Sequence, residues 1–169
     1  TFTILNNTPP NITAISCGLN HSIFLTSSGE LYSYGNNSNG QLGLGDFITR
    51  SSPVLVPGIP HIEVVSCAMI DSWAIDEMGI LHHSGRTNCA KTFRQFLDMP
   101  VRAISSGSLA SHWLIKDTEG AVWAFGNNSS CQLGISEQNT VTEPTKWPDK
   151  NPEIVLGSRP HVRNKSARK

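Results

Sequence analysis

The stretch GNNSNGQLG, residues 35–43, returns 91 positions later as GNNSSCQLG, residues 126–134. The residues before the two copies also correspond, since His21 and His112 stand at the same offset. A repeated glycine-rich loop is either a pair of phosphate-binding loops or one structural unit used more than once. The matching flanks favour the structural unit.

A third copy fills the gap between these two. Residues 65–85, VSCAMIDSWAIDEMGILHHSG, align without a gap to residues 15–35, and Gly79 then corresponds to Gly29. Successive copies are therefore 50 and 41 residues apart. Periods of this size are typical of propeller blades or of solenoid turns.

Each copy has the composition of short β-strands. Residues 22–26 and 31–34 are rich in β-branched and aromatic side chains, and Gly29 lies between them, where a hairpin needs a positive φ. Residues 52–57 carry prolines at both ends, which suits an exposed outermost strand. About four strands per copy are expected, so the predicted fold is all-β, with four-stranded antiparallel blades of a propeller.

The pattern of the first copy closely resembles the repeat of the regulator of chromosome condensation family. It joins a Gly-x-x-His-Ser opening to a Gly-x-Asn-x-x-Gly-Gln-Leu-Gly loop. The residues that we assign to the structural repeat motif are Gly18, His21, Gly29, Gly35, Gln41, Leu42, Gly43, Gly79, Gly85, Gly107, His112, Gly120, Gly126, Gln132, Leu133 and Gly134. The resemblance implies a seven-bladed β-propeller that binds other macromolecules.

The later copies depart from this pattern. In the second, Ala68 replaces the first glycine, Asp71 the histidine and Ser84 an aromatic residue, and no Gln-Leu-Gly loop follows Gly85. The third copy has two extra residues between its first glycine and His112.

A blade of roughly fifty residues allows 169 residues to build about three blades, whereas propellers close with roughly four to eight. We expect propeller repeats over residues 1–158, with blades near 12–57, 62–100 and 101–147 and the start of another at 153–158. A fragment of a larger propeller is favoured over a short chain that closes a ring with other copies or a divergent arc. An open arc leaves blade edges that invite pairing with another chain.

The formal net charge is zero, but residues 159–169 form a basic tail. Its cationic residues are Arg159, Arg163, Lys165, Arg168 and Lys169. A disordered, solvated terminus is the preferred interpretation, and contact with nucleic acid, chromatin or an acidic partner is the alternative.

The positions of the cysteines and histidines in the repeat indicate that these residues have structural roles. Cys17 and Cys67 share one position of the repeat and are expected to be buried, and four cysteines in a chain of this length do not predict a disulfide framework. This argues for the cytoplasm or the nucleus. The adjacent pair His82 and His83 would point to opposite faces of a strand, so no metal site is expected there. His21 and His112 are interpreted as hydrogen-bonded structural residues. A contribution of these two histidines to a binding surface is the alternative.

The two Gly-Asn-Asn-Ser loops lack the helix or the following lysine that a phosphate site requires. We interpret each loop as a latch to the neighbouring blade, with a leucine that inserts between blades and a glutamine that satisfies loop amides. No catalytic motif is present, and Asp71, Asp76 and Glu77 are interpreted as turn and surface residues. No catalytic residue, cofactor or metal is therefore predicted.

The leading functional prediction is a non-catalytic scaffold that binds a partner protein. The runner-up is guanine-nucleotide exchange on a small GTPase, an activity of some members of the family. A third alternative is a propeller domain within a larger chromatin or ubiquitin-ligase protein. The chain has no apolar run long enough for a membrane helix, so no membrane association is expected.

Overall fold

The computed structural model describes residues 7–87, 89–135 and 140–147, and these form twelve β-strands in three four-stranded antiparallel sheets. Blade 1 contains β1 (Ile12–Cys17), β2 (His21–Thr26), β3 (Leu31–Gly35) and β4 (Arg50–Leu55). Blade 2 contains β5 (Ile62–Cys67), β6 (Asp71–Asp76), β7 (Leu81–Gly85) and β8 (Ala90–Gln95). Blade 3 contains β9 (Val101–Ser105), β10 (His112–Asp117), β11 (Val122–Gly126) and β12 (Val141–Lys146). The predicted all-β fold with four strands per blade is confirmed.

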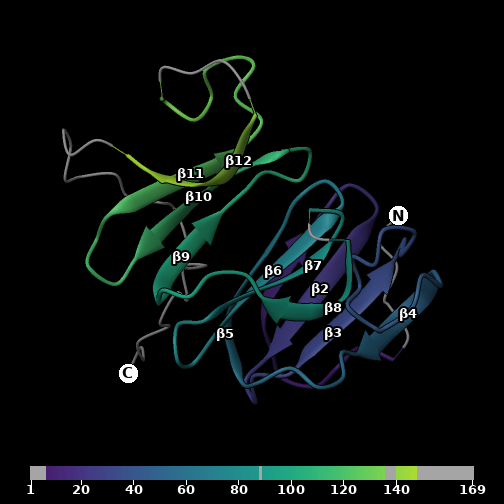
Figure 1. Ribbon diagram of the computed structural model, residues 1–169. Helices are drawn as coiled ribbons and strands as arrows, with labels where there is room; N and C mark the ends of the chain where they lie inside the picture. The colour runs from purple at the N-terminus through teal and green to yellow at the C-terminus, as the bar shows by residue number, and fades with distance from the viewer. Residues whose placement is uncertain (1–6, 88, 136–139, 148–169) are drawn as a thin grey trace, which may run out of the picture.

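Within each blade the strands pair in the order of the sequence, so every blade is a simple meander (Figure 1). The registers of the three blades correspond, because His21, Asp71 and His112 each pair with the glycine that ends the third strand. Equivalent positions can therefore be compared directly from one blade to the next.

The central hairpin of each blade turns through the same glycine. Gly29, Gly79 and Gly120 have φ values of 75°, 78° and 94°, a region that costs other residues conformational strain. Each donates its N–H to the carbonyl of the residue three positions earlier. The positive φ expected at this hairpin is present in all three copies.

Two apolar clusters hold the blades together. One joins blades 1 and 2 and includes Ile23 and Leu31 on one side and Ala74 on the other. The second joins blades 2 and 3 and includes Trp73, Trp113 and Phe125. Blade 2 therefore lies between its two neighbours in sequence, with β5 contacting both β1 and β9.

Only one of the two equivalent cysteines, Cys17 and Cys67, is buried as predicted. Cys67 is 2% exposed, and it faces blade 1, where its Sγ atom lies 3.5 Å from the carbonyl oxygen of Ser16. Cys17 is exposed, because its side of blade 1 is not covered by another blade within the described residues. The prediction of a buried Cys17 is wrong, since burial at this position depends on a preceding blade.

The predicted blade start at 153–158 and the basic tail at 159–169 lie outside the described residues. Along the described chain there is no helix with the length and apolar character needed to cross a membrane.

Candidate functional site

The loop between β3 and β4, residues 36–49, reaches across to blade 2, and we call it the first latch. The Ser84 hydroxyl donates to the carbonyl oxygen of Gly40 at 2.6 Å. The Ser72 hydroxyl donates to the carbonyl oxygen of Gln41, also at 2.6 Å. Both serines are buried, so these bonds satisfy main-chain acceptors that water does not reach. The first latch thus joins blade 1 to blade 2, as the sequence predicts.

The outer part of the first latch adds to the edge of β8. The N–H of Gly45 donates to the carbonyl of Lys91 at 2.8 Å, and Leu44 forms an antiparallel bridge with Thr92. Gly43 has a φ of 71°, and a Cβ atom there would collide with the ring of Phe93. Close approach to the next blade therefore requires glycine at this position.

Side-chain amides hold the first latch in shape. Gln41 donates to the side-chain oxygen of Asn36 at 2.9 Å and accepts the N–H of Asn39 at 2.9 Å. The Oδ1 atom of Asn37 accepts the N–H of Leu42 at 2.9 Å, and the Leu42 side chain is fully buried. The predicted role of Gln41 is present, while the hydrogen bonds to blade 2 come from main-chain carbonyls.

A buried histidine extends this junction. The Nε2 atom of His21 lies 2.9 Å from the Oγ atom of Ser72. Because the Ser72 hydroxyl gives its one hydrogen to Gln41, His21 must donate from Nε2. Burial lowers the pKa of His21 to about 4, although the nearby carboxylate of Asp71 partly opposes this shift. His21 is therefore neutral near pH 7 and bridges two blades.

Among the described residues no such latch joins blades 2 and 3, and we call this the open junction. Residues 86–89 alone connect β7 to β8, where blade 1 uses residues 36–49. Trp113 and Phe125 occupy in blade 3 the places that Ser72 and Ser84 occupy in blade 2. Two large aromatic side chains thus stand where the serines of the first junction receive the first latch.

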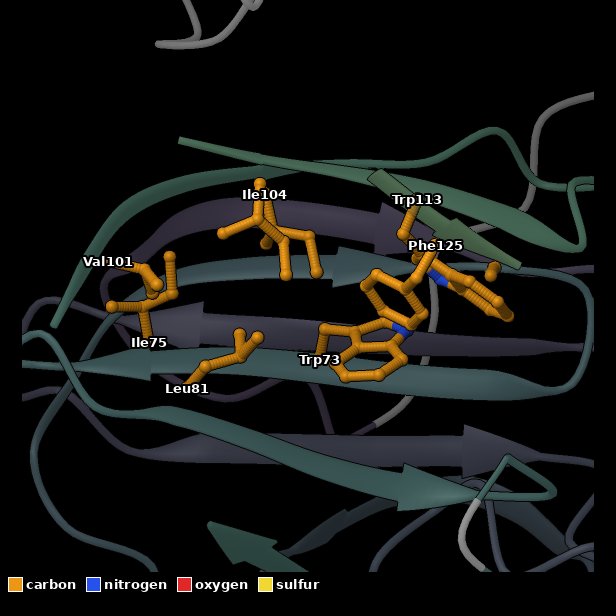
Figure 2. Packing of buried hydrophobic residues seen from close by; sticks show 9 residues of the cluster. Trp73, Ile75, Leu81, Val101, Ile104, Trp113 and Phe125 are labelled. Atoms are coloured by element: carbon orange, nitrogen blue, oxygen red, sulfur yellow. The ribbon is translucent and has the colours of Figure 1, made fainter. Parts of the chain in front are cut away.

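These aromatic side chains pack against Trp73 of blade 2 (Figure 2). The ring centroid of Trp73 lies 5.4 Å from that of Trp113 and 5.5 Å from that of Phe125. Trp113 and Phe125 stack on each other at 4.9 Å. Such contacts stabilise a core beyond the area that they bury, so aromatic packing replaces the hydrogen bonds of the first junction.

A cavity of about 480 Å³ remains at the open junction, a volume within the usual range for ligand pockets. It combines an aromatic wall with hydroxyl groups and the exposed cation of Arg86. Its lining includes Asp71, Arg86 and Thr87 from blade 2 and Trp113, Phe125 and Thr142 from blade 3. We regard this cavity as the candidate functional site.

Asp71 is a buried structural residue at the base of this junction, which corrects its interpretation as a turn or surface residue. Its Oδ1 atom lies 2.8 Å from the Nε2 atom of His83 and accepts the N–H of Thr87 at 2.8 Å. The side chain is 4% exposed. The sequence does not predict this burial because His83 becomes its partner only when β6 and β7 pair.

Asp76 is a turn residue, as expected, but it is also buried. It accepts the N–H groups of Met78 and Ile80 and pairs with His82 at 2.8 Å. Burial works against its charge, but the hydrogen bond from His82 and those from the backbone outweigh it, and the pKa of Asp76 falls below its ordinary value. Glu77 is exposed, as expected.

His82 and His83 pair with different carboxylates, as their alternation along the strand suggests. Among residues 7–87, 89–135 and 140–147, no group of three or more His, Cys, Asp or Glu side chains could hold a metal ion.

The remaining predicted motif residues lie at the positions that the repeat assigns to them. Gly35, Gly85 and Gly126 end the third strand of each blade with φ values of 105°, 128° and 103°. Gly18 and Gly107 follow the first strands of blades 1 and 3, and His112 begins β10 in a half-buried position.

The loop that begins at Asn127 repeats the internal bonds of the first latch, with Gln132 donating to Asn127 at 2.9 Å. Its Leu133 is fully buried. The Nε1 atom of Trp147 donates to the carbonyl of Leu133 at 2.5 Å, and its ring covers Gly134. An aromatic residue of blade 3 itself thus covers this glycine, where Phe93 of the following blade covers Gly43.

Sequence reasoning did not identify the receptor residues of the first latch, which are the two serines that bind it, or the aromatic residues that replace these serines in blade 3. Ser72 and Ser84 are unremarkable in the sequence, and Trp113 and Phe125 read only as strand residues. A signal was nevertheless available: the blade that follows the missing latch is the one with bulky aromatic residues at both receptor positions.

Comparison with known proteins identifies the repeats. Two profiles described as "Regulator of chromosome condensation (RCC1) repeat" match residues 12–41 and 28–69. The human probable E3 ubiquitin-protein ligase HERC6 is 33% identical over 144 residues, which cover 74% of this chain and 14% of that protein. The ultraviolet-B receptor UVR8 of Arabidopsis thaliana is 28% identical over 152 residues, which cover 82% of this chain and 34% of that protein.

A solved structure shows the same fold. Yeast RCC1 (Prp20), in its complex with Kap60, superposes with a TM-score of 0.70 at 18% identity, over 80% of this chain and 37% of that one. The chain thus spans about a third or less of the curated relatives named above. The matching repeats, the relatives and the three blades agree, and the chain belongs to the regulator of chromosome condensation repeat family.

Proposed function

We propose that this chain is a non-catalytic protein-interaction module, and that the open junction is its contact region. The observation that carries the proposal is the cavity of about 480 Å³ at the one junction between described blades that has no latch. Aromatic side chains with a cation at the rim are typical of protein interfaces, where Trp and Arg often dominate the binding energy.

The chemistry of the cavity supports binding over catalysis. Its carboxylate, Asp71, is already engaged by His83 and by the N–H of Thr87. The buried His21 and Ser72 of the other junction are likewise committed to a structural relay. Asp71 and His83 join two strands of blade 2, and His21 and Ser72 join blade 1 to blade 2, so among these described residues no free base lies beside a nucleophile.

The test is affinity capture from cell extract with the tagged full chain, compared with a variant whose cavity is blocked. Thr142→Arg places a long side chain at the rim of the cavity. Ser51→Arg is the matched control, because Ser51 occupies the equivalent exposed position on β4 of blade 1. Proteins that the wild type and Ser51→Arg recover, and Thr142→Arg does not, would support the proposal. Recovery of no specific protein by the wild type would contradict it.

Guanine-nucleotide exchange on a small GTPase is the second candidate. It is favoured by the fold shared with Prp20p of Saccharomyces cerevisiae, whose structure was reported with its binding properties to Gsp1p and histones. Accelerated release of labelled GDP from a panel of small GTPases, at sub-stoichiometric amounts of this chain, would favour exchange over scaffolding. Unchanged release would reject it.

Two relatives, HERC6 and HERC2, are named as E3 ubiquitin-protein ligases, which favours a role for these blades within a larger protein of that kind. In that setting the open junction would recruit a protein to the ligase. A contribution of the basic tail, residues 159–169, is tested by repeating the capture without it. Unchanged recovery of nucleic acid would reject a role for the tail.

A further inference from the structure

The two junctions can be compared position by position, because the blades share one register. Lys91 on β8 is one residue beyond the partner of Gly85, and Thr142 on β12 is one residue beyond the partner of Gly126. Thr142 therefore stands in blade 3 where Lys91 stands in blade 2. The Lys91 carbonyl is the group that accepts the N–H of Gly45 from the first latch.

The equivalent edge of β12 is left open by blade 2. Within the described residues, no backbone hydrogen bond or bridge joins blade 2 to residues 140–147. Thr142 and Glu143 are exposed. Pro144 follows them and has no N–H, but the first junction uses a carbonyl on this edge, so the proline removes no equivalent bond.

Cavities lie on both sides of this edge. Thr142 lines the cavity of about 480 Å³ and also a second one of about 430 Å³, which continues past Pro144 toward Met99 and Trp123. Together they follow β12 along the outside of the open junction. This is the shape that an extended chain segment needs, and it lies along a strand edge.

The open junction also contains unpaired donors. Among the described residues, the Nε1 atoms of Trp113 and of its neighbour Trp73 are buried and have no hydrogen-bond partner. Trp113 occupies the position of Ser72, whose hydroxyl donates to the main-chain carbonyl of Gln41. Buried donors are usually paired, so the site lacks the kind of acceptor that a peptide backbone supplies.

The charge at the rim is positive. Arg86 is exposed and takes part in no ion pair with the described residues. Asp71 faces the same cavity, but its carboxylate is already hydrogen-bonded to His83 and to the N–H of Thr87. In this cavity the uncompensated group that a ligand meets is the guanidinium of Arg86, whereas the exposed Glu143, which also forms no ion pair with the described residues, lines the second cavity.

We propose that the open junction binds an extended peptide segment of a partner protein, which takes the place of the missing latch. The segment adds to β12 by donating an N–H to the carbonyl of Thr142, as Gly45 does to Lys91. It packs an apolar side chain against Trp113 and Phe125 and directs an acidic residue to Arg86. This inference rests on the proposed function and specifies the chemistry of its partner.

The probe is a displayed library of random dodecapeptides selected on the full chain. Enriched peptides are expected to carry an apolar residue near an acidic one, and to bind with a Kd below roughly 100 µM. Thr142→Arg and Arg86→Glu are each expected to weaken binding at least about tenfold, whereas the matched Ser51→Arg leaves it unchanged. Equal binding by Thr142→Arg and Ser51→Arg, or no binder in the selection, overturns the proposal.

Indole N–H signals in a ¹H–¹⁵N spectrum show where the peptide binds. The Trp113 signal is expected to move downfield as its N–H gains an acceptor. Trp147, whose N–H is already bonded to the carbonyl of Leu133, provides the reference that stays in place. A shift at Trp147 without one at Trp113 overturns the proposal.

The two proposals fail separately. If capture of a partner is lost in Thr142→Arg but the selection yields no peptide binder, only this inference falls. If capture recovers a partner equally well with Thr142→Arg and with wild type, the chain is an interaction module that uses another surface, and the open junction falls as the contact region together with this inference. If capture recovers nothing, the proposed function falls as well.

Discussion

The Nε2 atom of His21 lies 2.9 Å from the Oγ atom of Ser72, and this contact joins two blades through residues 51 positions apart. Ser72 passes its own hydrogen to the carbonyl of Gln41 at 2.6 Å. One serine hydroxyl therefore satisfies a buried histidine and a buried loop carbonyl at once. In blade 1 the relay gives a structural role to the histidine that begins the second strand.

Ser72→Ala should destabilise the chain strongly for so small a change. It leaves the His21 N–H and the Gln41 carbonyl without partners, and each buried unsatisfied group costs about 1–3 kcal/mol. Urea unfolding should therefore show a lower midpoint. Ser22→Ala is the control, because Ser22 follows His21 on β2 and is more accessible than Ser72. It should change the free energy of unfolding by less than about 0.5 kcal/mol. Equal effects of the two substitutions would contradict the relay.

The stability of the chain should fall between about pH 6.5 and pH 4. The folded pKa of His21 is about 4, below the ordinary 6.5, so in this interval the unfolded chain binds a proton that the folded chain does not. The contribution of neutral His21 to the free energy of unfolding is complete above pH 6.5. It is lost as the pH falls toward 4, and the total loss is roughly 3 kcal/mol. His21→Gln should flatten the curve in this interval. A curve that is identical in the variant would show that another group is responsible.

Gly43→Ala should cost more than Gly58→Ala, although both glycines have a positive φ, of 71° and 66°. At Gly58 the added methyl meets no atom within 4 Å, so only backbone strain of about 1–2 kcal/mol applies. At Gly43 the methyl also collides with Phe93 on the next blade, which adds about 1–3 kcal/mol. Thermal unfolding of both variants measures the difference, and equal melting temperatures would mean that the first latch does not press on blade 2.

Asp71→His restores the residue that the repeat normally carries, but we expect it to destabilise this chain. His83 would lose its carboxylate and the N–H of Thr87 its acceptor, and each buried group left without a partner costs about 1–3 kcal/mol. Asp71→Asn keeps an oxygen at the same place and should cost less. Chemical denaturation compares the two variants, and a histidine variant as stable as wild type would show that the pair is dispensable.

Much of the architecture could be predicted from the sequence because it depends on local chemistry. The hairpin glycine Gly29 and the amide-rich loop around Gln41 act within a few residues of themselves. Their equivalents in later copies therefore have the same roles wherever the blade is placed. The missing loop after Gly85 is visible in the sequence for the same reason.

The roles of Asp71, Trp113 and Cys17 could not be predicted, because each depends on a surface supplied by another strand or blade. Asp71 becomes buried when β7 brings His83 to it, and Trp113 becomes part of a cavity when blade 2 offers no latch. Cys17 and Cys67 share one position of the repeat but differ in burial, since only Cys67 faces a blade that covers it. The sequence by itself determined the blade and its loops through short-range backbone geometry. The tertiary structure alone decided how one blade meets the next, because that contact joins residues some thirty to fifty positions apart.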